Sequence, residues 1–450
     1  MFKSINPFNE KVLTEFEEDS QPELGQKISQ AAKTFDHWKD VSIEERKGLL
    51  FSLAKELRSQ SGKLAELATL EMGKPIKQAE SEVEKCAWLC EHYTENGSKY
   101  LANRTIESDG SKSWVSFEPL GVILGVLPWN FPYWQAFRFA VPTILAGNTT
   151  LVKHASNVQG CAGEIQQLFE SSGFPKGAYQ NLRISSKKVA QVIEHEAVKA
   201  TSLTGSEKAG SAVAQKSGAE IKKSLLELGG SNAFIVLADA ELEKMADLCV
   251  NARMQNNGQS CIAAKRIILE EPIAEKFTKM LIERIENLKV GDPLDEEVDI
   301  GPVAREDLAA DLEKQMNESI GKGASLEIGG ERKKAHFSPA LLKDVKPGMP
   351  AFDEETFGPL LSVIIAKSAD HAVELCNLSR FGLGATICTS DTDKAISLAK
   401  KIEDGAVFIN ELVKSDPRMP FGGTKISGYG RELGEFGIRE FVNIKTYYVK

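Results

Sequence analysis

The chain has 450 residues, with 55 Lys and Arg against 64 Asp and Glu, so its formal net charge is −9. Apolar residues make up 42% and charged residues 26%, proportions that exclude a collagen-like, low-complexity or largely disordered protein. At about 100–200 residues per domain, the length predicts roughly two to four domains. The acidic balance and the absence of Lys/Arg-rich blocks argue against nucleic acid or an anionic membrane as a main partner.

Helical periodicity dominates the first hundred residues, where apolar residues recur at three- and four-residue spacing over 43–58, 62–72 and 79–100. From residue 121 short β-rich runs alternate with helical segments. Strands are predicted at 122–127, 150–152, 179–184, 198–203 and 224–228, with helices near 134–145 and 160–170. Strands that alternate with helices of this length indicate βαβ units and a parallel sheet.

A second α/β series begins near residue 232. Its strands are predicted at 233–237, 266–269, 361–365, 384–388 and 406–409, and its helices at 242–255 and 273–288. Two successive series predict two domains that meet near Glu227. The segment 103–119 interrupts the first series and the tail 440–449 follows the second; both read as strands, so they could pair as an arm.

The location of the protein is predicted from three features. The uncharged segment 119–137 contains three prolines, Asn130 and Gln135, which a lipid-facing helix would not favour, so we expect buried core rather than a membrane span. The N-terminus has no continuous apolar stretch, so we expect no secretory signal. Seven cysteines without a CxxC pair fit reduced thiols in the cytoplasm better than a disulfide framework.

Two side chains could perform covalent or acid–base chemistry. Cys261 follows Gly258 at a loop-to-strand junction, where a thiol is accessible; the other six cysteines read as packing residues. Glu227 lies among leucines at the end of a strand, where desolvation raises the pKa of a carboxyl group towards that of a general base. A salt bridge or a hydrogen-bonded cap is an equally weighted alternative for Glu227.

Two turns could bind negative charge. At Gly205-Ser206 a strand runs into a helix, whose free N–H groups could approach phosphate oxygens, although an ordinary turn would look the same. Asn130 lies between Pro128 and Pro132, where its amide could donate to a developing oxyanion or simply serve the turn. No metal-ligand spacing, GxSxG elbow or P-loop occurs, so we predict no metal site.

Five motifs in this order resemble the aldehyde dehydrogenase superfamily. They are PWNFP at 128–132, LTGSxxxG at 203–210, LELGG at 226–230, GQSC at 258–261 and ETFGP at 355–359. The resemblance covers essentially the whole chain. Within it, the tripeptide Lys153-His154-Ala155 is similar to the one that the short bacterial succinate-semialdehyde dehydrogenases have at this position.

The resemblance implies an α/β fold with a Rossmann-type cofactor domain at 1–102 and 120–227 and an α/β catalytic domain at 228–428. A β oligomerisation arm at 103–119 and 429–450 would join the subunits of a homodimer or homotetramer.

The resemblance also implies a reaction, the NAD(P)-dependent oxidation of an aldehyde to a carboxylic acid. Cys261 would carry the thiohemiacetal and the thioester, Glu227 would be the general base, and the Asn130 amide with the Cys261 N–H would form the oxyanion hole. The cofactor is expected to contact Trp129, Lys153, Ser156, Gly205, Ser206, Leu228, Glu355 and Phe357.

The prediction of which cofactor the protein uses rests on Ser156. Three residues after the lysine, NAD-preferring relatives have a glutamate that would repel the 2′-phosphate of NADP. The neutral Ser156 admits that phosphate, so we expect NADP, with NAD possible. An alternative is that Ser156 only caps the following helix.

The expected substrate is succinate semialdehyde, because Arg138 stands where similar enzymes place a carboxylate-binding arginine. A surface arginine or an internal salt bridge is the alternative. Where a second arginine is common, this chain has Gln255, and Ser415 and Arg253 are candidates to compensate.

Three other functions stay open. The first is a dehydrogenase for another aliphatic aldehyde. The second is an acylating dehydrogenase, which would not need Glu227. The third is a retired structural member, against which the complete set of Cys261, Glu227 and Asn130 argues.

Overall fold

The first sheet of the computed structural model, which describes residues 1–450, has inner strands that are largely buried on both faces. The strand order is β21 (Gly428–Tyr429), β9 (Lys223–Glu227), β8 (Val198–Thr204), β5 (Val122–Val126), β6 (Thr149–Lys153) and β7 (Tyr179–Asn181). In β5, Ile123 packs into one hydrophobic core, whereas Val122 and Leu124 pack into another. Side chains of a strand alternate between faces, so a strand that is apolar throughout needs cover on both.

Eight helices supply that cover. They are α1 (Gln21–Trp38), α2 (Ile43–Ser59), α3 (Ser61–Met72), α4 (Ile76–Tyr100), α5 (Trp134–Leu145), α6 (Gln159–Ser171), α7 (Val189–Glu194) and α8 (Glu207–Ala219). Residues of α2 to α6 share the core that contains Ile123, and residues of α1, α7 and α8 share the other. The uncharged segment 119–137 is confirmed as core, since α5 is buried along its whole length. No helix of the structure is both long and apolar enough to cross a membrane.

The chain reverses its direction of travel across this sheet between β5 and β8. From β5 it proceeds outward through β6 to β7, and it then returns to the other side of β5 as β8 and continues to β9. All five strands are parallel, so the loops that leave β5 and β8 emerge at the same edge. Ligands of open α/β sheets bind at such a switch point, outside the carboxyl ends of the strands.

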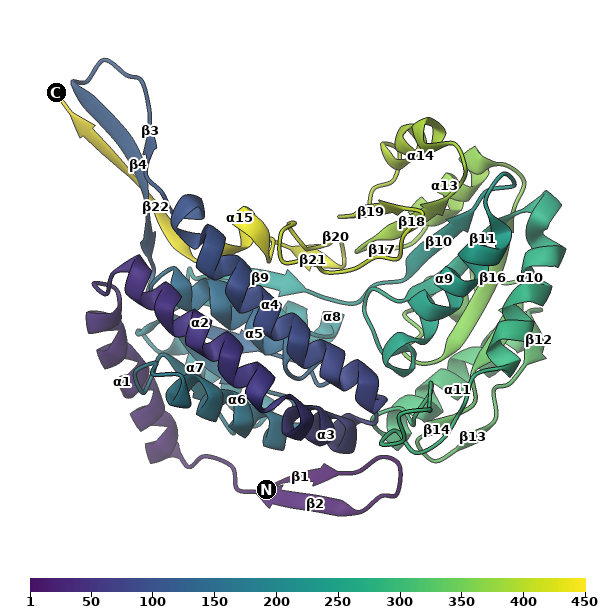
Figure 1. Ribbon diagram of the computed structural model, residues 1–450, viewed down its shortest axis with the longest axis horizontal. Coiled ribbons are helices and arrows are strands. Elements are labelled where there is room, and N and C mark those ends of the chain that lie inside the picture. The colour runs from purple at the N-terminus through teal and green to yellow at the C-terminus, as the bar shows by residue number, and fades with distance from the viewer.

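A second sheet forms the other body, to the right in Figure 1. Its strand order is β12 (Ser325–Ile328), β15 (Ala340–Lys343), β16 (Leu360–Ala366), β11 (Ala264–Glu270), β10 (Asn232–Val236), β18 (Ala385–Cys388) and β19 (Val407–Ile409). One face packs on α9 (Leu242–Met254) and α10 (Glu271–Glu286). The other packs on α11 (Glu306–Gly321), α12 (Pro350–Asp353), α13 (Ala369–Asn377) and α14 (Thr392–Ala399).

The expected pairing of the two outlying segments is confirmed. Strand β22 (Val442–Val449) lies antiparallel to β4 (Lys112–Pro119), from Val442 opposite Pro119 to Val449 opposite Lys112, and β3 (Arg104–Thr105) pairs with the other edge of β4. These strands form an arm that projects from the first body, with the C-terminus at its tip (Figure 1).

The predicted boundaries of the arm and of the second body need correction. Residues 429–441 belong to the first body, because β21 pairs with β9 and helix α15 (Gly434–Ile438) contacts α4 and α5. Leu433, Ile438 and Phe441 are buried in the core of that body. The last strand of the second sheet ends at Ile409, and the chain then returns to the first body. These apolar residues are too few and too closely spaced to reveal their partner from sequence.

The N-terminus differs from the helical prediction for the first hundred residues. Strands β1 (Phe2–Ile5) and β2 (Val12–Phe16) form a hairpin, which lies along the lower edge of the molecule in Figure 1. Its loop reaches the second body, where Lys334 pairs with Glu10 and the His336 ring contacts the Phe8 ring edge-on at 5.4 Å. Both strands are short and largely exposed, so they carry no clear alternation of apolar residues.

Candidate active site

Cys261 lies in the loop between α9 and β11, and the backbone before it is unusual. Asn256, Asn257 and Gly258 all have positive φ, at 58°, 56° and 71°. A side chain at Gly258 would collide, because its Cβ would lie 2.3 Å from the carbonyl oxygen of Gly358. Glycine adopts the left-handed region freely, and asparagine tolerates it better than most residues do. The run Asn-Asn-Gly therefore builds the turn that positions Cys261.

The amide side chains of this turn hold it against its surroundings. Asn257 Nδ2 donates to the carbonyl oxygens of Gly73 at 2.8 Å and Pro302 at 2.9 Å. Asn256 Nδ2 donates to the Asn130 carbonyl at 2.8 Å. Asn130 follows a strand of the first sheet and Cys261 precedes a strand of the second, so these hydrogen bonds fix the thiol relative to both bodies.

Two N–H donors are available beside Cys261. Asn130 and Cys261 line the same cavity. One Asn130 Nδ2 hydrogen is donated to the Gln259 carbonyl at 3.0 Å, and a primary amide has a second hydrogen to donate. The backbone N–H of Cys261 donates to no carbonyl of the chain. Together these groups can stabilise an oxygen that becomes negative at this point.

Glu227 ends strand β9 and is only 2% exposed. Burial, with a contribution from the negative charge of Glu432, raises the pKa of Glu227 well above its usual range. The predicted desolvation of this carboxyl group is thereby confirmed. The alternative of a salt bridge or hydrogen-bonded cap is wrong, because neither carboxylate oxygen has a hydrogen-bond partner. A buried carboxyl group without a partner is free to exchange a proton with a molecule in the cavity.

The environment of the sulfur keeps it protonated in the free protein. Cys261 is the one half-buried cysteine; the buried ones, predicted as packing residues, are Cys86, Cys90, Cys161, Cys249, Cys376 and Cys388. Desolvation raises the pKa of the Cys261 thiol to about 11, although Lys265 and Arg138 act in the opposite direction. The group is therefore a neutral thiol at neutral pH.

Two cavities meet at Cys261. A cavity of about 260 Å³ lies between α4, α5 and the segment 412–415, and a cavity of about 200 Å³ lies where the loops after β5 and β8 emerge. Cys261 and Gln135 line both. A molecule in each cavity can therefore reach the same sulfur, which is the arrangement that a reaction between two bound compounds requires.

The smaller cavity contains most of the residues expected to bind the cofactor, namely Trp129, Gly205, Ser206, Leu228, Glu355 and Phe357. Ser206 begins helix α8, and its Oγ accepts from the Ala209 N–H at 3.4 Å. The rings of Trp129 and Phe357 meet edge-to-face with their centroids 5.8 Å apart. This cavity combines a helix N-terminus with two aromatic rings at the switch point of the sheet.

Lys153 and Ser156 lie outside the smaller cavity, Lys153 as the last residue of strand β6 and Ser156 in the turn that follows it. Lys153 is half-buried, and desolvation lowers its pKa. Ser156 is exposed in the turn before α6. The alternative that Ser156 caps α6 is wrong, because the N-cap position is Val158 and the first N–H groups of the helix donate to Glu71 at 2.9 Å. The Ser156 hydroxyl is therefore available to a ligand.

Arg138 and Ser415 both line the larger cavity. The guanidinium of Arg138 pairs with the buried carboxylate of Glu432, which is the internal salt bridge considered as the alternative. The guanidinium also donates to Thr204 Oγ1 at 3.4 Å. Ser415 Oγ accepts from Lys85 Nζ at 3.0 Å and from Trp134 Nε1 at 2.9 Å.

Arg253 is not part of this cavity, which corrects the expectation that it compensates for a missing arginine. It is fully buried, and its guanidinium donates to main-chain carbonyls, among them Leu360 at 2.7 Å and Gly258 at 3.0 Å. Arg253 therefore holds together the segments around the turn before Cys261. These hydrogen bonds to main-chain carbonyls, which the sequence does not reveal, keep the Arg253 guanidinium out of the cavity.

Two lysines near Cys261 were not singled out from the sequence. Lys265 is buried and donates to the Cys261 carbonyl at 2.9 Å and to Glu355 Oε1 at 2.8 Å. A lysine inside the apolar strand β11 was the available signal, since a buried ammonium requires partners. Lys85 lines the larger cavity, but one lysine on an amphipathic helix gives no such signal.

The comparisons with known proteins agree over the whole chain. The family model described as "Aldehyde dehydrogenase family" matches residues 1–447. The chain is 45% identical over 449 residues to a probable succinate-semialdehyde dehydrogenase [NADP(+)] of Synechocystis, covering 99% of each chain. It is 45% identical to a succinate semialdehyde dehydrogenase [NAD(P)+] of Escherichia coli, covering 98% of this chain and 96% of the relative. The solved succinic semialdehyde dehydrogenase of Streptococcus pyogenes with NADP+ has a TM-score of 0.98 at 35% identity and covers all of both chains.

The pKa of about 11 predicts how Cys261 reacts with iodoacetamide in the free protein. Only the thiolate reacts, so the alkylation rate should rise about tenfold per pH unit from pH 7 to pH 10. Mass spectrometry of the digested protein measures the rate at each cysteine, and Cys261→Ala serves as the control for the buried thiols. A rate that levels off near pH 7 would show that the resting group is already a thiolate.

Proposed function

The chain belongs to the aldehyde dehydrogenase family, and from this premise we propose that it oxidises succinate semialdehyde to succinate with NADP. The single observation that carries the proposal is the meeting of two cavities at Cys261. The larger cavity would hold the aldehyde. At about 260 Å³ it is smaller than the 300–1,000 Å³ of common ligand pockets, which suits a short substrate. The relatives named for this reaction support the choice of aldehyde.

The residues of the smaller cavity and of the β6 turn fit NADP. Helix α8 directs free N–H groups towards that cavity, where a pyrophosphate would be stabilised, and Gly205 and Ser206 lie at its start. Trp129, Leu228 and Phe357 would contact the nicotinamide half, and Glu355 would accept a hydrogen bond from its ribose. Lys153 and Ser156 would contact the adenosine ribose and its 2′-phosphate. When bound, the nicotinamide supplies the acceptor for the hydride.

The Cys261 thiol would give its proton to water in the cavity and attack the aldehyde carbon as a thiolate. The resulting oxyanion would be stabilised by the second Asn130 Nδ2 hydrogen and by the Cys261 N–H, and loss of one such donor costs about 3–4 kcal/mol in comparable sites. After oxidation the acyl group remains on the sulfur as a thioester. Glu227, buried and without a partner, would take a proton from the water that hydrolyses it.

The arm would join copies of this chain into a homodimer or homotetramer. Its apolar side chains include Ile106, Ile444 and Tyr448, which are 40%, 64% and 57% exposed in the single chain. Apolar surface of this kind is typical of a protein–protein contact. We place the enzyme in the cytoplasm, where reducing conditions suit its seven free thiols.

Initial rates on two aldehydes test the proposal. We expect kcat/KM for succinate semialdehyde to exceed that for butanal by at least tenfold, because the two differ only in the distal carboxylate. Equal values would exclude selection for a carboxylate, and activity with neither would support a retired member of the family.

Glu227→Gln tests the two-step mechanism. Without the base, oxidation still forms the thioester, but its hydrolysis stalls. We expect a burst of about one NADPH per active site followed by a slow steady rate, measured at 340 nm in a stopped-flow instrument. Cys261→Ala should give neither burst nor turnover. An unchanged steady rate in Glu227→Gln would assign the base to another residue.

Ser156→Glu tests the cofactor assignment. In wild type we expect kcat/KM to favour NADP over NAD, and in the variant we expect the ratio to shift towards NAD by at least tenfold, because the new carboxylate repels the 2′-phosphate. Ser156→Gln, of similar size without charge, is the matched control. A wild-type preference for NAD of tenfold or more would show that another residue determines the choice.

A further inference from the structure

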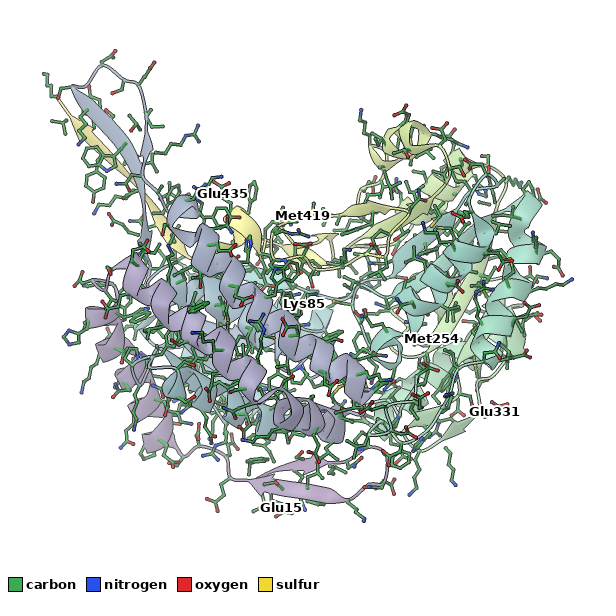
Figure 2. The ribbon with its side chains drawn as sticks, viewed as in Figure 1. Glu15, Lys85, Met254, Glu331, Met419 and Glu435 are labelled. Carbon is green, nitrogen blue, oxygen red and sulfur yellow. The ribbon has the colours of Figure 1, made fainter.

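Gln135 is the one residue besides Cys261 that lines both cavities. It lies in the first turn of α5, where its backbone N–H donates to the Phe131 carbonyl at 3.1 Å, and it is only 2% exposed. Lys85, which lines the larger cavity from α4, lies near the centre of the molecule in Figure 2. The Gln135 side chain is therefore buried inside the molecule, at the point where both bound compounds would meet the sulfur.

No hydrogen bond holds the side-chain oxygen of Gln135. Its Oε1 is shielded from solvent and has no partner in the chain. Buried polar atoms without a partner are rare in folded proteins, and one beside a reacting group indicates a partner that comes from outside the chain. A half-turn about the last side-chain bond exchanges the oxygen with the NH₂ group. Since Oε1 has no hydrogen bond to lose, the oxygen can turn towards the cavities.

The smaller cavity contains two acceptor groups of this kind. Glu227 and Gln135 line it together with Cys261, and neither oxygen of Glu227 has a partner either. By contrast, Glu355 Oε1 already accepts from Lys265 Nζ at 2.8 Å. Succinate semialdehyde with an ionised carboxylate has no hydrogen to donate, whereas a water molecule has two. The two acceptors therefore fit a water molecule better than they fit the aldehyde.

We propose that Gln135 is a further catalytic residue, which holds the water that hydrolyses the thioester. This inference rests on the proposed function and completes its last step. One O–H of the water points to Glu227 and the other to Gln135 Oε1, so that a lone pair faces the acyl carbon. As the C–O bond forms, Glu227 takes the first proton and the C–S bond breaks. The electron pair stays on Cys261 as a thiolate, and the second hydrogen leaves with the acid.

This role is confined to one step of the reaction. Addition of the sulfur to the aldehyde and departure of the hydride need no bound water, so the acceptor at Gln135 is not used in them. A variant without this acceptor should therefore form the acyl-enzyme normally and lose it slowly. A residue that only packs the cavity would affect the earlier steps as well, because they occur at the same sulfur.

Gln135→Met tests the proposal, because methionine has a similar length but no acceptor oxygen. Enzyme with saturating NADP is mixed with less aldehyde than active sites, and mass spectrometry of quenched samples follows the acyl group on Cys261. We expect NADPH to form within twofold of the wild-type rate, and the acyl group to be lost about 10- to 100-fold more slowly because the water is misplaced. Gln180→Met is the matched control, since Gln180 is buried in β7 and lines neither cavity.

Two further measurements separate the water from packing. Hydroxylamine attacks a thioester without a general base, so it should release the acyl group from Gln135→Met and from wild type at the same rate. The double variant of Gln135→Met and Glu227→Gln should lose the acyl group within threefold of the rate of Glu227→Gln alone, because both residues act on one water. Gln135→Leu, which also lacks the oxygen, replaces Gln135→Met if that variant does not fold.

The outcomes separate the two proposals. Loss of the acyl group at the wild-type rate in Gln135→Met, equal slowing of NADPH formation, or multiplied effects in the double variant would each overturn the role of Gln135. A wild-type enzyme that forms an acyl-enzyme from butanal but none from succinate semialdehyde would instead overturn the proposed substrate. The role of Gln135 would then be tested on the butanal acyl-enzyme in the same way.

Discussion

The candidate active site depends on the hydrogen bonds of one left-handed turn. Cys261 comes from the second body, whereas Asn130 and Glu227 come from strands and loops of the first. Asn256 and Asn257 bind carbonyl oxygens of the first body and of the segment near residue 302, so the thiol is fixed by contacts on both sides. If this turn relaxed, every side chain would remain but the two cavities would no longer share a sulfur.

Much of this arrangement could be predicted from the sequence, because its signals are local. The buried strands read as apolar runs, and helix α5 was predicted with the bounds that the structure has. Cys261 was recognisable because it is a thiol in a loop that contains Gly258, and Glu227 because it is a carboxyl group among leucines at the end of a strand. Sequence patterns of this kind report the burial and exposure of a residue through its immediate neighbours.

The features that escaped prediction depend on contacts between distant segments. Arg138 shows this, since its partner Glu432 lies almost three hundred positions later and no spacing links them. Whether a charge is balanced is a property of the tertiary structure, and residue identity alone cannot give it.

The return of the chain after Ile409 has a consequence for the order in which the protein can be completed during synthesis. Strand β21 and helix α15 fill places in the first body, although they leave the ribosome after the whole second body. The first body therefore cannot complete its core while it is being translated. The apolar groove that α15 fills stays exposed until the C-terminal residues have been made. Chaperone dependence during translation and sensitivity to C-terminal truncation should both be concentrated in the half of the molecule that is made first.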